Sequence, residues 1–94
     1  MDIGVPAEIK TAERRVSLTP GVVDELTSRG HRVVVESDAG LGAGFGDAEY
    51  KEVGAAIVDS ADEVFDTSEM IVKVKEPQAV ERARIKPHHT LFTY

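Results

Sequence analysis

Short apolar runs rich in β-branched residues alternate with helix signals from one end of this 94-residue chain to the other. Such alternation favours parallel strands, because consecutive parallel strands must be joined by crossover segments that are usually helical. The predicted fold class is α/β, with a mostly parallel sheet of about five strands and helices on both faces, of the Rossmann-like or flavodoxin-like kind. The predicted strands are 2–6, 31–36, 55–58, 70–74 and 90–94, and the predicted helices are 20–29, 47–53 and 61–66.

Local signals define where two of these helices begin. Thr19 can cap free backbone N–H groups, and Pro20 fits the first helical position, where no donor is needed. Ser60 followed by Glu63 makes a capping box at the start of the later helix. Gly30 is expected to end the first helix in a left-handed conformation.

Composition excludes several classes of protein. The net charge of −6 argues against a nucleic-acid groove, which needs a basic stripe. No apolar run approaches the ~20 residues that span a bilayer. The absence of cysteine rules out disulfides and thiolate zinc sites. We therefore expect a cytoplasmic protein that binds neither nucleic acid nor membrane.

Two other patterns give no functional site. The glycines at 40, 42, 44 and 46 do not match the Gly-x-Gly-x-x-Gly spacing of a dinucleotide loop, so a turned surface loop is predicted. His88 and His89 have no histidine or carboxylate three or four residues away to complete a metal site, and they are predicted to lie in a loop. No metal site is predicted.

Two cations remain as site candidates. Arg15 and Lys75 each follow a predicted strand, and the carboxyl ends of parallel strands border the crevice where open α/β sheets bind ligands. The guanidinium of Arg15 suits a carboxylate held by two parallel hydrogen bonds. The alternative is a surface arginine paired with Glu8 or Glu13.

Lys73 and Lys75 lie two residues apart and so project from the same face of their strand. Lys75 is nearer the carboxyl end and is the better candidate, because partial burial there would lower the pKa of its ammonium and allow proton exchange. The alternative is that both lysines extend along the surface and place their charges in water.

A resemblance to a known family runs through the whole chain. The blocks that carry it are Ile3-Gly4-Val5-Pro6, Glu8-Ile9-Lys10, Arg14-Arg15-Val16, Leu18-Thr19-Pro20, Gly30-His31, Glu36, Ala39-Gly40-Leu41-Gly42, Phe45, Tyr50, Gly54-Ala55, Ile57-Val58, Val72-Lys73-Val74-Lys75-Glu76-Pro77 and Leu91-Phe92-Thr93-Tyr94. Together these blocks resemble the amino-terminal part of alanine dehydrogenase.

The resemblance implies roles for both cations. Arg15 would bind the carboxylate of pyruvate or L-alanine, and Lys75 would act as the catalytic residue that contacts the reacting carbonyl or amine. It implies NAD-dependent oxidation of L-alanine to pyruvate and ammonium, with NAD carried by a separate nucleotide-binding domain that is absent from this chain. The family's histidine acid/base would follow closely after the Leu91-Phe92-Thr93-Tyr94 strand, outside this sequence.

One departure from the family is Ala7, where lysine is common after the first proline. The larger departure is the absence of the nucleotide-binding domain. Because of it, residues 1–94 are expected to be part of a substrate-binding domain that binds no NAD and has no turnover alone. Expected partners are the missing nucleotide-binding domain or other copies of the chain, in a homo-oligomer. The alternatives are the amino-terminal region of a proton-translocating transhydrogenase α subunit and a stand-alone module that binds small carboxylates.

The predicted last strand, 90–94, looks like a buried strand. An uncovered strand edge is a ready template for pairing with another chain. We therefore expect further polypeptide, or another copy of the chain, to cover it.

Overall fold

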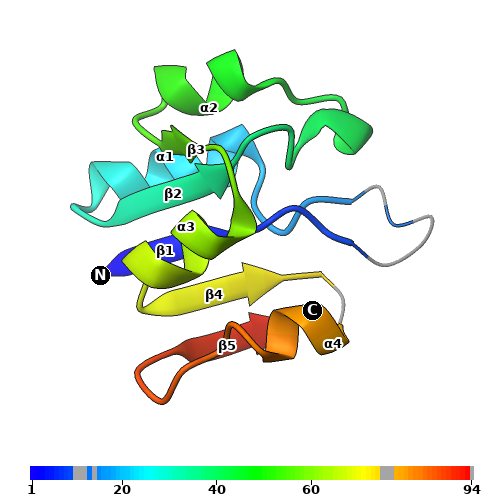
Figure 1. The fold of residues 1–94 in the computed structure, drawn as a ribbon. Helices are drawn as coiled ribbons and strands as arrows, with labels where there is room; N and C mark the ends of the chain where they lie inside the picture. Colours follow the sequence, from blue (N-terminus) through cyan, green and yellow to red (C-terminus); the bar gives the residue numbers. More distant parts are fainter. Residues whose placement is uncertain (10–12, 14, 75–77, 94) are drawn as a thin grey trace.

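All five strands run parallel in one sheet, in the spatial order β3-β2-β1-β4-β5 (Figure 1). The structure is a computed structural model, and it describes residues 1–9, 13, 15–74 and 78–93. The strands are β1 (Asp2–Val5), β2 (Arg32–Glu36), β3 (Ala56–Val58), β4 (Met70–Lys73) and β5 (Thr90–Thr93). The predicted α/β class and the parallel sheet are confirmed.

Helices connect the strands, and the three predicted ones end within a residue of their expected bounds. The helical segments are α1 (Pro20–Ser28), the short 3-10 turn η1 (Leu41–Ala43), α2 (Asp47–Glu52), α3 (Ala61–Thr67) and α4 (Ala79–Arg82). Thr19 accepts a hydrogen bond from the backbone N–H of Val22, and Ser60 accepts one from that of Glu63. Gly30 has a φ of 89°, the left-handed conformation expected after the end of α1.

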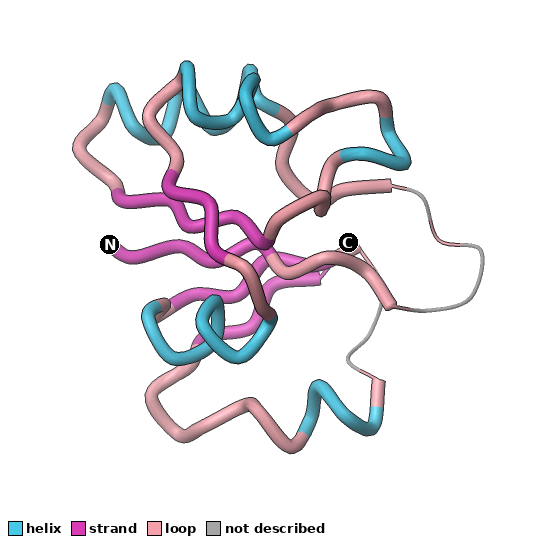
Figure 2. Tube along the Cα trace, turned by 45° about the horizontal axis from the view of Figure 1, so that its top comes forward, coloured by secondary structure: helices cyan, strands magenta, loops and turns pink. Residues whose placement is uncertain are grey.

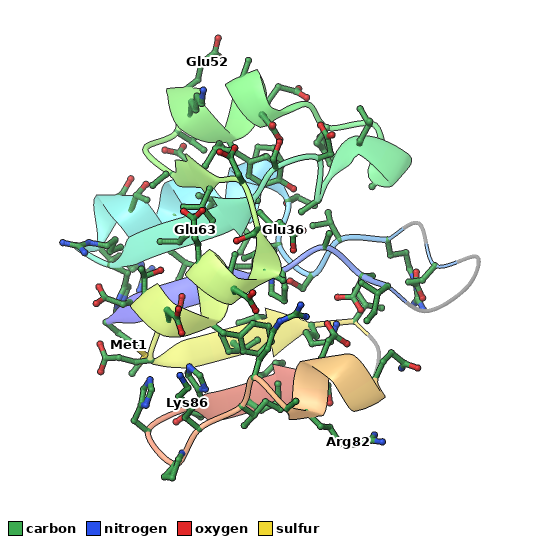
Figure 3. All side chains as sticks on the ribbon, in the orientation of Figure 1. Met1, Glu36, Glu52, Glu63, Arg82 and Lys86 are labelled. Atoms are coloured by element: carbon green, nitrogen blue, oxygen red, sulfur yellow. The ribbon has the colours of Figure 1, made fainter. Side chains whose placement is uncertain are left out.

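The sheet separates two hydrophobic cores, and helices lie on both of its sides (Figure 2). The larger core packs β1 and β2 against α1 and α2 through Val5, Val23, Val35 and Tyr50, among others. The smaller core packs the other face against α3 through Val34, Val64, Phe65 and Ile71. Charged side chains such as those of Glu52, Glu63 and Arg82 lie on the exposed outer surface (Figure 3).

The strand order creates a switch point beside the central strand. After β1 the chain builds outward to β2 and β3, and it then returns to place β4 on the other side of β1. Successive crossovers on the two sides of β1 leave through opposite faces of the sheet. The segments that follow β1 and β4 therefore border a crevice at the carboxyl edge, the usual ligand site of such sheets.

The prediction that the terminal strand is buried is wrong for the described residues. All four residues of β5 are exposed, with 38% exposure at Leu91 and 52% at Phe92. The reason is position, because β5 is the outermost strand and its described neighbour in the sheet is β4. Within the described ranges, each helix is too short or too polar to cross a membrane.

Candidate functional site

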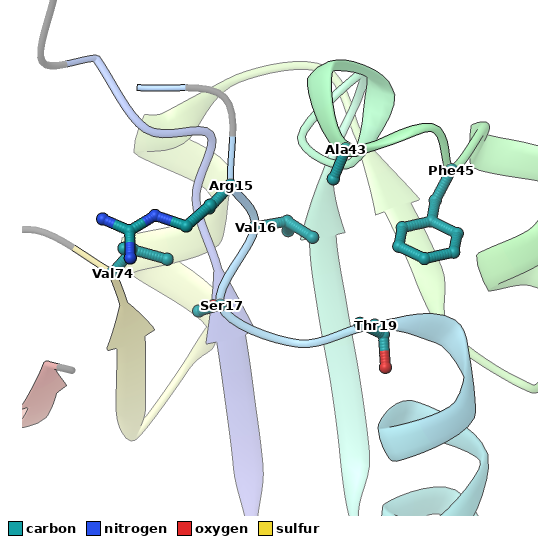
Figure 4. A pocket seen from close by; sticks show the side chains of 7 residues that line it. All are labelled: Arg15, Val16, Ser17, Thr19, Ala43, Phe45 and Val74. Carbon is teal, nitrogen blue, oxygen red and sulfur yellow. The ribbon is translucent and has the colours of Figure 1, made fainter. Parts of the chain in front are cut away.

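A pocket of about 450 Å³ opens at the carboxyl edge of the sheet, where the segments after β1 and β4 come together. This volume is within the usual range of small-molecule sites. Its lining comes from the segment after β1, from the end of β4 and from the glycine-rich loop (Figure 4). The lining residues are Arg15, Val16, Ser17, Thr19, Ala43, Phe45 and Val74.

Arg15 lines this pocket, and its side chain extends from the loop toward the end of β4 (Figure 4). It is also paired with Glu13: Nε donates to Oε2 and Nη2 donates to Oε1, both at 3.0 Å. The Glu13 side chain is buried while that of Arg15 is 65% exposed. The hydrogen bond and the charge of Glu13 raise the pKa of Arg15 above its ordinary value. The pairing alternative considered from the sequence is thus present, with Glu13 as the partner.

This pairing leaves part of the guanidinium available. Glu13 engages the edge of Arg15 formed by Nε and Nη2, and among the described residues Nη1 has no hydrogen-bond partner. A guanidinium carries five N–H donors in a planar fork. The end edge of Arg15, formed by Nη1 and Nη2, can therefore still bind a carboxylate while Glu13 holds the other edge.

Lys75, the second predicted site residue, lies outside the described residues. Its neighbour Val74 is described, is 5% exposed, and lines the same pocket as Arg15. The segment that leads to Lys75 therefore reaches the pocket.

For Lys73, the alternative of a side chain that extends along the surface into water is wrong. Its side chain is 1% exposed rather than extended into water. Nζ donates at 3.0 Å to Oε1 of Glu8, and it lies 2.8 Å from Oε2 of Glu81 in an ion pair that lacks hydrogen-bond alignment. Both carboxylates are also buried, with 3% and 1% exposure. Two acids thus replace the water that a buried ammonium would otherwise need.

Sequence reasoning missed Glu8 and Glu81 as parts of this edge of the sheet. One signal could have indicated them: Lys73 interrupts an apolar strand, and a lysine inside such a strand requires a buried acidic partner. Which acid supplies the partner could not be deduced, because Glu8 is 65 residues away in the sequence.

The glycine-rich loop does not fit a phosphate. Four of its backbone N–H groups, those of residues 41 and 43–45, donate to carbonyl oxygens of the same loop, and that of Gly46 donates to Glu49. These donors are consequently not directed at a ligand, in agreement with the predicted turned loop.

The two adjacent histidines lie in the loop before β5, as predicted. His89 Nδ1 accepts from the N–H of Lys86 at 2.9 Å, and its Nε2 lies 2.6 Å from the carbonyl oxygen of Phe65. These contacts dock the loop onto α3. No group of three potential metal ligands is found among the described residues.

Comparison with known proteins extends over the whole chain. The profile of the family described as alanine dehydrogenase/PNT, N-terminal domain, matches residues 4–94. Alanine dehydrogenase from Halomonas elongata is 51% identical over 94 residues, which are 100% of this chain and 25% of that protein. The chain thus spans about a quarter of the length of the curated relatives it matches.

Solved structures agree with the sequence comparison. An L-alanine dehydrogenase superposes with a TM-score of 0.93 at 45% identity, covering 100% of this chain and 26% of that one. A transhydrogenase from Sinorhizobium meliloti superposes with a TM-score of 0.86 at 30% identity, covering 99% and 26%. The chain therefore belongs to the alanine dehydrogenase/PNT N-terminal domain family.

Proposed function

We propose that this chain forms part of the substrate-binding domain of an alanine dehydrogenase and supplies the half-site that binds pyruvate or L-alanine. One observation carries the proposal: Arg15 lines a pocket at the switch point of the sheet, in a chain 51% identical to an alanine dehydrogenase. Residues 1–94 would contribute binding and orientation, and the rest of the active site would come from the longer protein.

Arg15 would bind the substrate carboxylate through the edge that Glu13 leaves available. Glu13 holds the plane of the guanidinium by two hydrogen bonds, which reduces the freedom that the side chain would lose on binding. The apolar side chains of Val16, Ala43 and Val74 line the same pocket and suit the methyl group of a three-carbon acid. Carboxylate at one end and methyl at the other would orient the reacting carbon between them.

The proposed reaction consumes L-alanine, NAD and water and yields pyruvate, ammonium, NADH and a proton. NAD supplies the hydride acceptor. Because five N–H groups of the glycine-rich loop, those of residues 41 and 43–46, bond within the chain, we propose that NAD binds outside this chain. Lys75 is the proposed catalytic residue, which would polarise the carbonyl of pyruvate or exchange a proton with the amine of alanine.

The test uses the full-length protein that contains this chain, assayed with L-alanine and NAD and, in reverse, with pyruvate, ammonium and NADH. Replacing Arg15 by Lys should weaken carboxylate binding by about 1–3 kcal/mol, because lysine cannot make the two parallel hydrogen bonds. The KM for pyruvate should rise by the corresponding factor. Replacing Lys75 by Met should lower kcat much more than it changes KM.

Several outcomes would contradict the proposal. An unchanged KM for pyruvate would remove Arg15 from the site, and normal turnover of the Lys75→Met variant would dismiss its catalytic role. A full-length protein that binds pyruvate without any turnover would instead favour a carboxylate-binding module.

The second candidate is the amino-terminal region of a transhydrogenase α subunit, because a transhydrogenase shares this fold at 30% identity. The higher identity of the L-alanine dehydrogenase, 45%, favours the dehydrogenase. Hydride transfer between two nicotinamide dinucleotides, without turnover of alanine, would establish the second candidate.

A further inference from the structure

Three buried charged side chains next to the pocket have no part in the function proposed above. Glu8 comes from the segment after β1, Lys73 from the end of β4, and Glu81 from α4. Their side chains are between 1% and 3% exposed. We call them the Glu8–Lys73–Glu81 network.

Each carboxylate of the network also accepts a hydrogen bond from a backbone N–H group, and these two groups belong to the residues on either side of 75–77. Oε2 of Glu8 accepts from the N–H of Val74 at 3.0 Å. Oε1 of Glu81 accepts from the N–H of Gln78 at 2.9 Å. Val74 and Gln78 are the described residues on either side of 75–77, the segment that contains Lys75.

Lys73 connects the two anchor points. Its ammonium lies within 3.0 Å of one oxygen of each carboxylate, so a single cation couples the position of Glu8 to that of Glu81. Bonds within a buried network are strong because water does not compete with them. Val74 and Gln78 are thus linked through Lys73, by hydrogen bonds on the Glu8 side and by an ion pair on the Glu81 side.

Stability alone is a weak reason to bury this network. Taking charges out of water costs several kcal/mol per ion, and well-packed apolar residues of similar size often give an equal or greater stability. Apolar side chains make no hydrogen bonds to the main chain. This network makes two directional hydrogen bonds to backbone N–H groups beside a ligand pocket, so it can fix the position of the main chain there.

We propose that the Glu8–Lys73–Glu81 network is a set of positioning residues for the reaction: it fixes Val74 and Gln78, the described residues nearest to Lys75 on either side, relative to the pocket that Arg15 lines. The inference rests on the proposed function, since it concerns the placement of the proposed Lys75. Arg15 is held mainly by Glu13, and the charge of Glu8 has a smaller influence on it. The segment of Arg15 is tied to β4 by the hydrogen bond from Ser17 Oγ to the carbonyl oxygen of Val72 at 2.7 Å. The network should therefore affect kcat more than substrate binding.

The test is the Glu8→Gln variant of the full-length protein. Glutamine keeps the size of glutamate but has one acceptor oxygen, so it cannot accept from both Val74 and Lys73 as the two oxygens of Glu8 do. With that oxygen on Val74, the amide NH2 faces the Lys73 ammonium and the link between the two sides of the network is broken. Lys73 keeps its ion pair with Glu81, so the fold should be retained. Because a misplacement of about 1 Å can cost a hundredfold in rate, we expect kcat with pyruvate, ammonium and NADH to fall at least about tenfold. The KM for pyruvate should stay within about threefold of the wild-type value.

The Glu81→Gln variant is the second test, and it perturbs the network from the α4 side. It leaves the Lys73–Glu8 pair in place, and its amide oxygen can still accept from Gln78. It should also lower kcat at nearly constant KM. Should Glu8→Gln fail to fold, this variant decides the proposal alone.

Val64→Ala serves as the matched control for a general loss of stability. Val64 is 0% exposed on α3, on the side of the sheet that faces the smaller core, and it does not line the pocket. The melting temperature should fall while kcat below that temperature stays unchanged.

Two results would overturn the proposal: a kcat of the glutamine variants within about threefold of wild type, or a kcat loss equal to that of Val64→Ala. If the wild-type full-length protein turns over neither alanine nor pyruvate, the proposed function fails instead.

Discussion

Tyr50 is a buried phenol that ties α2 to the segment leading into the pocket. Its hydroxyl donates at 2.8 Å to the carbonyl oxygen of Leu18, next to the pocket residue Thr19. The side chain is 0% exposed. Burial, and then the charges of Glu49 and Asp47, raise the pKa of Tyr50 to about 12.

This pKa predicts a specific alkaline loss of stability. The ordinary value is 10.0, so the contribution of Tyr50 is fully present below pH 10 and is lost as the pH rises through about 12. Tyr50→Phe should be less stable at neutral pH by about 1 kcal/mol, because the carbonyl oxygen of Leu18 loses its donor. The difference in unfolding free energy between wild type and variant should shrink from pH 10 to 12.

Urea unfolding of both proteins at a series of pH values measures that difference, and the comparison cancels the titration of lysines and of other groups common to both. A difference that stays constant above pH 10 would contradict the raised pKa.

At the residue scale, the location of a side chain could be predicted where the residue follows the end of a strand. Arg15 was placed at the pocket because it follows β1, and the structure has it in the lining. Its partner Glu13 was one of two acids considered. The buried pairing of Lys73 was not predicted, because it depends on Glu8 and Glu81, which reach it only after the sheet and α4 have formed.

At the element scale, close contact between β1 and α3 depends on one glycine. A Cβ atom at Gly4 would overlap Ser68 Oγ and would lie 2.8 Å from Cγ1 of Val64. Both of these residues are buried, so neither can move into solvent. The central strand and its covering helix therefore approach each other more closely than any larger residue would permit.

The Gly4→Ala variant should lose about 1–3 kcal/mol of stability, the usual cost of adding volume to a packed interior. Gly21→Ala is the matched control, because the nearest atom to its Cβ would be Thr19 Oγ1 at 3.9 Å. Alanine there lies in α1 and should be neutral or stabilising by up to about 1 kcal/mol. Chemical denaturation measures both, and equal effects would contradict the packing argument.

Elements whose signals are local were well predicted. The caps at Thr19 and Ser60 and the left-handed Gly30 depend on neighbours within a few residues. The order of the strands depends on contacts between distant segments, and the alternation of strand and helix does not specify it. The exposure of β5 could not be predicted either, because an apolar sequence is compatible with a central strand and with an edge strand of a sheet.

At the scale of the whole molecule, the sheet ends in an exposed apolar edge at β5. Leu91 and Phe92 expose 38% and 52% of their surface. Exposed strands with apolar side chains are sites where further polypeptide or another copy can pair. We therefore predict that the isolated 94-residue chain self-associates through this edge.

We expect the isolated chain to sediment faster as its concentration is raised. Phe92→Lys should reduce this dependence, because a charge on an edge strand opposes pairing. Val22→Lys is the control, since Val22 is 46% exposed on α1, away from β5. Sedimentation velocity over a hundredfold range of concentration measures the effect. A wild-type chain that stays monomeric throughout would contradict the argument.

The pocket is divided between segments that follow β1 and β4, and this division has a consequence for how the protein matures. Glu8 meets Lys73 and Val74, which lie 65 and 66 residues later in the sequence, only when β4 has docked beside β1. Contacts between such distant segments form late in folding, because each requires the closure of a long loop. A small acid could then bind at Arg15 only after the native strand order is complete. Chains that are partly folded, or that end before β4, would not bind it.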